Sequence, residues 1–179
     1  VVNNVETLAA AAGILLNGAE KFAAIGNKKS AGTKLVCFDS FFNNPGVYEI
    51  EMGTPMKKVL NDIGGGFKEP IKALQIGGPL GGVIPLAEAE KLNLDFQEFT
   101  AAGFMLGHAS IVSIPKDFPM VEYIHHLFEF TAEESCGKCF PGRLGSYRGK
   151  EMFDQLKSKT AKIPLKVLND LLLTMKNGC

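Results

Sequence analysis

The first hydrophobic pattern in the chain is helical. After Asn4, which is a good N-cap, apolar residues recur every three or four positions as far as Leu16, and Gly18 provides a stop. A shorter helix is indicated over residues 20–25, and the polar segment 27–32 reads as a linker. Residues 1–32 are therefore predicted to form a helical segment separate from the rest of the chain.

The pattern changes after the linker to short apolar or alternating runs. Residues 47–52 alternate between apolar and charged side chains, and a strong turn signal, Asn43–Gly46, separates them from the apolar run 35–38. A short helix is expected after Pro55, and further strands are expected over 71–76 and 110–114. Hairpin, helix and strand in this order predict an α+β fold in which residues 33–115 form a β-grasp module.

Helical spacing returns after Pro119 and predicts a long amphipathic helix. Second and third helices are indicated over 144–156 and after Pro164, so residues 116–179 should form a small helical bundle. The pattern predicts a buried face on the third helix made by Leu165, Leu168, Leu171, Leu172 and Met175.

Composition narrows the class of protein. The 179 residues are 46% hydrophobic with a net charge of zero, and no basic stripe suggests nucleic acid as a partner. No apolar run reaches the roughly 18 residues of a membrane span, and no signal peptide is visible, so we expect a cytoplasmic protein without membrane insertion. The chain begins without Met, and we expect it to be part of a longer protein.

Two cysteines mark the candidate chemistry. Cys136 and Cys139 stand in a glycine-rich turn between two predicted helices, and Cys179 would meet this turn if the last helix returns to the same end. Such a pair can bind a metal or an iron–sulfur cluster, or close into a redox disulfide. A dithiol oxidoreductase and a docking fragment with empty cysteines stay open as alternatives. Cys37, within an apolar strand, is expected to be a core thiol.

The longer string ESCGKCFPGRLG around these cysteines resembles the cluster-binding segment of the flavin- and NADH-binding subunit of complex I and of related NAD-dependent formate dehydrogenases and hydrogenases. The resemblance covers the C-terminal part of that subunit. It implies a 4Fe-4S cluster with Cys136, Cys139 and Cys179 among its ligands. The family has a further cysteine where this chain has Gly142, so the ligand set departs from the pattern.

The N-terminal string VNNVET resembles the family segment that contacts flavin mononucleotide, which implies that Asn3, Asn4 and Thr7 bind FMN. In the family the glycine-rich FMN and NAD loops lie in an earlier domain, and no such motif is present here. The resemblance therefore implies an electron-transfer fragment of an NADH-oxidising enzyme, with other subunits of an oxidoreductase complex as partners. We expect the chain alone not to oxidise NADH.

Overall fold

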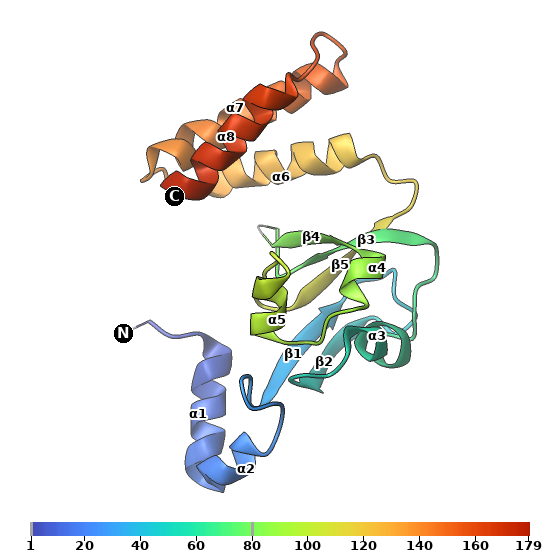
Figure 1. Cartoon of the computed structure of the whole chain (residues 1–179), viewed down its shortest axis with the longest axis vertical. Helices are drawn as coiled ribbons and strands as arrows, with labels where there is room; N and C mark the ends of the chain where they lie inside the picture. Colours follow the sequence, from blue (N-terminus) through green and yellow to red (C-terminus); the bar gives the residue numbers. More distant parts are fainter. Residues whose placement is uncertain (1, 80) are drawn as a thin grey trace. The chain divides into compact units, whose positions relative to one another are not determined.

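The structure is a computed structural model that describes residues 2–79 and 81–179. It divides into two compact units, one ending at Lys116 and the other formed by Asp117–Cys179 (Figure 1). No helix in the described part of the chain combines the length and apolar character needed to cross a bilayer.

A five-stranded mixed sheet forms the centre of the first unit. Its order is β2-β1-β5-β3-β4, in which β1 and β5 are parallel and the other neighbouring pairs are antiparallel. The strands are β1 (Thr33–Phe38), β2 (Gly46–Glu51), β3 (Ile71–Ile76), β4 (Gly82–Pro85) and β5 (Ser110–Pro115). The predicted hairpin and the strands over 71–76 and 110–114 are confirmed, and the fold is mixed α/β.

The alternation of side chains along strand β1 determines which of its residues enter the core. Exposed and buried residues alternate along it, as the two-residue period of a strand requires, so Lys34, Val36 and Phe38 point inward. Cys37 falls on the other face and is exposed. The expectation of a core thiol at Cys37 is therefore wrong, because it rests on the apolar character of the run and ignores the alternation of its faces.

Short helices complete the first unit. They are α3 (Met56–Lys58), which continues into a wider turn η1 (Val59–Ile63), α4 (Leu86–Ala89) and α5 (Phe96–Ala101). The hydrophobic pattern over 82–109 indicates no clear helix or strand, so β4, α4 and α5 are not predicted from the sequence. A local signal for α5 exists, because Asp95 caps it by accepting hydrogen bonds from the Gln97 and Glu98 amides at 2.8 and 3.0 Å.

The second unit consists of three helices, as the sequence predicts: α6 (Met120–Glu134), α7 (Phe140–Lys157) and α8 (Leu165–Gly178). Helix α7 packs against both α6 and α8. The predicted buried face of α8 is wrong, because no residue of this helix is buried and Leu165 and Leu172 are 74% and 44% exposed. Three residues of the predicted face, Leu168, Leu171 and Met175, are half-buried, and Leu171 and Met175 lie beside Gly145 of α7.

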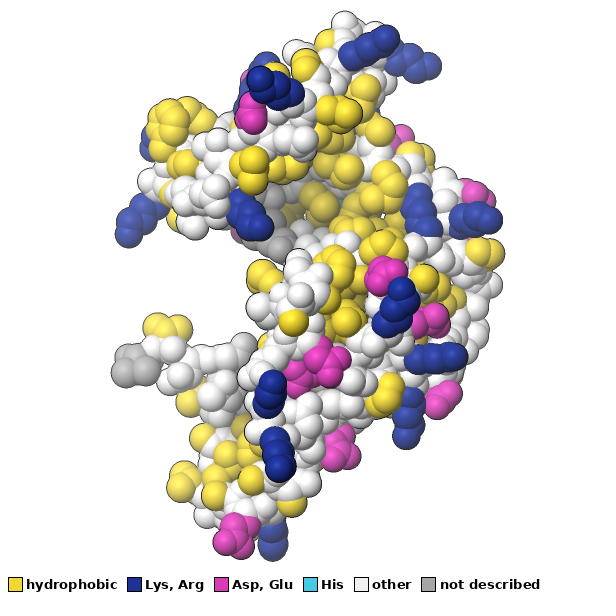
Figure 2. All heavy atoms as spheres, in the orientation of Figure 1, with side chains coloured by type: hydrophobic (Ala, Val, Ile, Leu, Met, Phe, Trp, Pro, Cys, Tyr) yellow, Lys and Arg dark blue, Asp and Glu magenta, His cyan; other side chains and the backbone are white. Residues whose placement is uncertain are grey.

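The chain begins with α1 (Val5–Asn17) and α2 (Ala19–Ala23), close to their predicted bounds. Asn4 caps α1 by accepting a hydrogen bond from the Glu6 amide at 2.8 Å. No residue of α1 is buried, and Leu15 and Leu16 are 87% and 85% exposed; hydrophobic side chains cover the helix surface in Figure 2. Local propensity and a few polar contacts therefore hold α1 in place.

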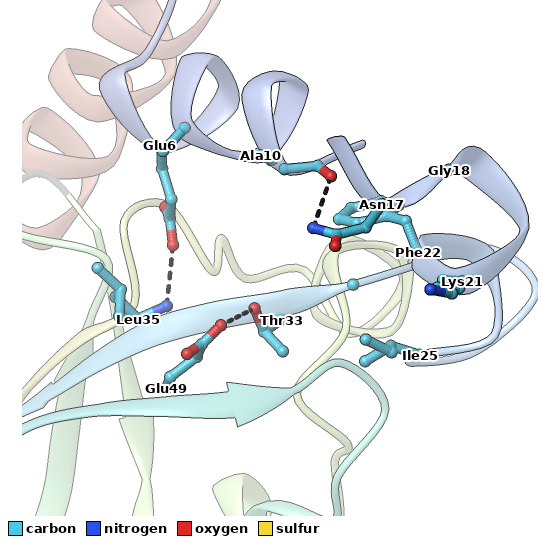
Figure 3. A pocket seen from close by; sticks show the side chains of 13 residues that line it. Glu6, Ala10, Asn17, Gly18, Lys21, Phe22, Ile25, Thr33, Leu35 and Glu49 are labelled. Atoms are coloured by element: carbon cyan, nitrogen blue, oxygen red, sulfur yellow. Dashed lines mark hydrogen bonds between the residues drawn. The ribbon is translucent and has the colours of Figure 1, made fainter. Parts of the chain in front are cut away.

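Glu6 makes the principal polar contacts between α1 and the sheet. Its carboxylate accepts a hydrogen bond from the Leu35 amide of β1 at 2.8 Å (Figure 3) and forms an ion pair with the buried Lys34. Burial favours the neutral acid, but the hydrogen bonds from Leu35 and Lys34 outweigh it and lower the pKa of Glu6 from its ordinary 4.5.

The substitution Glu6→Gln tests this tether. Because it leaves the Lys34 ammonium without its counter-ion, we expect about 1–2 kcal/mol less protection of α1, or ~5–30-fold faster amide exchange, with β3 and β5 unchanged. A carboxylate whose pKa is lower in the folded state than in the unfolded state contributes its full stabilising free energy above the unfolded-state pKa, here about 4.5. This free energy is lost as the pH falls through the lower, folded-state pKa. Exchange in the wild type, corrected for intrinsic rates, should therefore approach that of the variant on acidification.

Lys34→Met supplies the matched control for the tether. In the double variant both charges are absent, so neither is left unpaired. Amide exchange of α1 in the double variant should therefore be slower than the rate predicted by adding the effects of the two single variants. Equal protection of α1 in the wild type and in Glu6→Gln would contradict a tether through Glu6.

Candidate metal centre and flavin-facing edge

The cysteine turn begins where α6 ends. Ser135 leaves the helical conformation, and its hydroxyl accepts a hydrogen bond from the Gly137 amide at 3.2 Å. Gly137 has φ of +69°, a left-handed conformation that favours glycine and reverses the chain. Cys139 then occupies the N-cap position of α7. The sequence Ser-Cys-Gly-Lys-Cys thus forms a tight link between two helices.

Cys139 and Cys179 meet although forty positions separate them. Their sulfur atoms lie 2.9 Å apart, at the start of α7 and the end of α8. The hydrogen bond with Cys179, helped by the Gly142 amide, lowers the pKa of Cys139. The same hydrogen bond, with the negative charges of Cys139 and Cys136 nearby, raises the pKa of Cys179. The pKa shifts of the pair therefore favour the thiolate at Cys139 over the thiolate at Cys179.

Glycines bring the end of α8 to this position. A Cβ atom added at Gly145 would lie 2.7 Å from Cγ of Met175, and one added at Gly178 would lie 2.6 Å from Cγ of Pro141. Real Cβ atoms do not approach other atoms so closely, so both contacts need glycine. Helix α8 consequently packs tightly on the first turns of α7, and Cys179 arrives at the cysteine turn.

Gly142 faces the two sulfur atoms. A Cβ atom built on it would lie 2.7 Å from Sγ of Cys139 and 3.0 Å from Sγ of Cys179. A side chain at position 142 would therefore point into the thiol pair. This is the position at which the resemblance described above leads one to expect a further cysteine, and this chain has glycine there.

Cys136 is exposed and stands slightly apart from the pair. Within residues 2–79 and 81–179, no three His, Cys, Asp or Glu side chains are grouped closely enough to hold a metal ion. In this structure the cysteines are arranged as a thiol pair with a third thiol nearby.

The donor set decides how well an iron–sulfur cluster fits. Three thiols lie at one end of the bundle, which is the ligand type that clusters require. The fourth position, where the added Cβ atom would point, has no side chain. The thiol chemistry suits a cluster, but the described residues are not grouped as a metal site and position 142 supplies no fourth thiol.

The turn also differs from a thioredoxin site. In that fold the CxxC motif follows a strand and begins a helix within a βαβ unit. Here Cys136 follows the 15-residue helix α6, and the described residues after Asp117 contain no strand. The dithiol oxidoreductase alternative therefore lacks its structural context.

Residues of the VNNVET segment line a hollow in the first unit. Asn4 and Thr7 border a cavity of about 360 Å³, whereas Asn3 is exposed and is not among its lining residues. Three further lining residues come from separate segments and were missed by the sequence reasoning: Lys34, Phe96 and His108. No single motif joins these segments, so local patterns could not have identified them together.

A second hollow, of about 570 Å³, lies between α1, α2 and the hairpin (Figure 3). Ala10, Phe22 and Ile25 line it, and Thr33 donates a hydrogen bond to Glu49 at its floor at 2.6 Å. Its lining also includes the charged residues Glu6, Lys21 and Glu49. Because this hollow separates much of α1 from the hairpin, α1 contacts the sheet chiefly through Glu6 rather than by packing on it.

Comparison with known proteins identifies relatives of both units. Residues 122–179 match the model of the NADH-ubiquinone oxidoreductase-F iron-sulfur binding region. The chain is 36% identical to NADP-reducing hydrogenase subunit HndC of Solidesulfovibrio fructosivorans, over 96% of this chain and 35% of that protein. It is 41% identical to a subunit of the NADH-quinone oxidoreductase of Escherichia coli, over 80% of this chain and 33% of that protein.

A solved structure agrees with these relatives. The NAD+-reducing [NiFe]-hydrogenase in its H2-reduced state superposes with a TM-score of 0.85 and 30% identity, over 98% of this chain and 30% of that one. The chain thus spans about a third of the length of the relatives that it matches. It belongs to the family of the flavin- and NADH-binding subunits of complex I and related hydrogenases, and it corresponds to one part of such a subunit.

Proposed function

We propose that this chain is the electron-exit part of an NADH-oxidising, FMN-containing subunit. The observation that carries the proposal is the meeting of Cys139, Cys179 and the backbone of Gly142 at one end of the region matched by the iron-sulfur family model. Two segments forty positions apart, the start of α7 and the end of α8, meet there.

Cys136, Cys139 and Cys179 would hold the cluster in this proposal. A bound iron–sulfur cluster supplies one-electron transfer without breaking or forming bonds in a substrate. The chain itself provides positive charge close to the thiolates. Arg143 donates a hydrogen bond to the Gly137 carbonyl at 3.4 Å, which holds its guanidinium at the turn, and Lys138 lies between the two cysteines. Both cations place positive charge beside the cysteine turn.

The N-terminal segment would form one edge of the flavin site. Asn3, Asn4 and Thr7 are the proposed FMN contacts, supported by the family motif and by the cavity that Asn4 and Thr7 line. Residues 1–32 are proposed to belong with a flavin-binding domain of the longer subunit, in which NAD would also bind. The exposed apolar residues of α1 favour such a neighbour.

The sheet region supports a finer fold assignment. We propose that residues 33–115 form a β-grasp module and residues 116–179 the helical cluster-binding domain. The support is the antiparallel hairpin β1–β2, the helical segment α3–η1 after it, and the parallel pairing of the first strand with the last, β1 with β5.

The partners in this proposal are other subunits of an oxidoreductase complex, which would accept the electrons. The named relatives are subunits of NADH-quinone oxidoreductase and of an NADP-reducing hydrogenase. We place the assembly in the cytoplasm, in some relatives beside a membrane complex. The four free thiols suit such a reducing compartment.

The 179-residue chain alone should not oxidise NADH. Its sequence has no glycine-rich nucleotide loop, so the hydride donor has no binding site. The measurement is NADH–ferricyanide turnover with added FMN, using a whole subunit of the family as the positive control. Turnover comparable to that control would refute the assignment as an electron-exit fragment.

Replacing Gly142 by Cys should increase iron binding. The side chain would point at Cys139 and Cys179 and complete a four-thiolate set, so anaerobic reconstitution should give about four irons per chain and a reducible paramagnetic signal. The unmodified chain should retain fewer irons and lose them faster in air, because one iron lacks a protein ligand.

Gly142→Ser is the matched control for this experiment. It adds a side chain of similar size without a thiol, and it should bind no more iron than the unmodified chain. Four stable irons in the unmodified chain, or no gain from the cysteine, would show that other groups complete the site.

A further inference from the structure

We propose that Cys139 and Cys179 are a disulfide-forming pair, and that a small-molecule disulfide such as oxidised glutathione converts them reversibly from dithiol to disulfide. The pair is distinct from the CxxC pair, because it joins the start of α7 to the end of α8. The proposal concerns the metal-free chain and does not depend on a role in electron transfer.

The distance between the sulfurs is the first argument. They lie 2.9 Å apart, and a disulfide requires about 2.05 Å. The two thiols therefore need to approach by less than about 1 Å to form the bond. Among the described residues, a sulfur–sulfur contact of this length is found between Cys139 and Cys179 and not at Cys136.

The packing around the pair is the second argument. The contacts of Gly178 with Pro141 and of Gly145 with Met175 fix the end of α8 against the start of α7. The two cysteines thus meet because the bundle is folded, and not by chance encounters of a flexible chain. A bond between them would preserve the arrangement that the helices already have.

The space at Gly142 is the third argument. Because position 142 has no Cβ atom, the two sulfurs share the volume that a side chain would occupy. Even the methyl group of alanine would lie 2.7 and 3.0 Å from them and would have to push them aside. Gly142 therefore leaves the site one ligand short and at the same time allows direct sulfur–sulfur contact.

The reaction balances as two successive thiol–disulfide exchanges. The thiolate of Cys139, which is partly exposed, attacks one sulfur of the small disulfide, forms a mixed disulfide and releases one small thiol. Cys179 then attacks the Cys139 sulfur, forms the intramolecular bond and releases the second small thiol. Two protons and two electrons pass from the protein to the reagent, which is reduced to two thiols.

The bond would have a consequence for metal binding. It links residues forty positions apart and consumes two of the three thiols at this end of the bundle. Thiolates are the metal-binding form of cysteine, so disulfide formation and metal binding at this site exclude each other.

The test uses the 179-residue chain after treatment with a chelator, equilibrated in glutathione buffers of graded redox potential. Remaining thiols are then alkylated and the linked peptides are identified by mass spectrometry. We expect one linkage, between the peptides of Cys139 and Cys179, with Cys37 and Cys136 alkylated. Cys136→Ser should give the same linkage at the same potential. Linkage of Cys136 to Cys139, or stable glutathione adducts without a cross-link, would overturn the proposal.

Two further measurements show whether the folded geometry directs the reaction. Gly142→Ala should lower the equilibrium constant for the disulfide at least tenfold, about 30 mV for two electrons, because its methyl group displaces the sulfurs. Gly13→Ala is the matched control, since Gly13 is also helical and has open space around it, and it should leave the constant unchanged.

The second measurement repeats the reaction on the wild-type chain in guanidinium chloride, which needs no folded variant. There, short-loop closure favours the Cys136–Cys139 pair, so the ratio of the proposed linkage to the CxxC linkage should fall at least tenfold. An unchanged ratio would show that the fold does not select the pair and would overturn the proposal.

Discussion

The packing of the three-helix bundle depends on the close approach of side chains from α6 and α8 to one face of α7. Gly142, Gly145 and Gly149 lie three and four positions apart, so they share that face. An added Cβ atom would lie 2.1 Å from the Phe128 ring of α6 at Gly149 and 2.7 Å from Met175 of α8 at Gly145. These two contacts position the neighbouring helices, and the cysteine site is where they bring the chain ends together. The arrangement of the cysteines at the turn thus depends on helix packing further along α7.

This constraint explains which features could be predicted from the sequence. The three long helices follow from their apolar spacing, and the hairpin follows from alternation on either side of a strong turn. The apolar spacing predicts a buried leucine face on helix α8, but α8 packs mainly on α7, and Leu165 and Leu172 stay exposed. Periodicity reports which residues share a face, and it does not report how much of that face a neighbour covers.

The candidate sites show the same limit. The cysteine turn was recognisable from its string, and Cys179 was expected there if the last helix returned to the same end, which it does. The sequence could not show that position 142 points at the two sulfurs, because this requires the packing of α8. In the first unit, Lys34, Phe96 and His108 join Asn4 and Thr7 around one cavity. Strand pairing and helix capping bring those segments together, and neither produces a contiguous motif.

The three glycines of α7 differ in what offsets their conformational disadvantage. Glycine in a helix interior costs about 0.5–1 kcal/mol relative to alanine. At Gly149 and Gly145 this cost is offset by apolar contact, since Phe128 also stacks on Phe153 with ring centroids 5.6 Å apart and Met175 covers the helix. Gly142 has two sulfur atoms as its neighbours instead, and it lies in the first turn, where the backbone amide points toward the thiols. Packing of the bundle therefore does not account for glycine at this position, and the close approach of two thiols does.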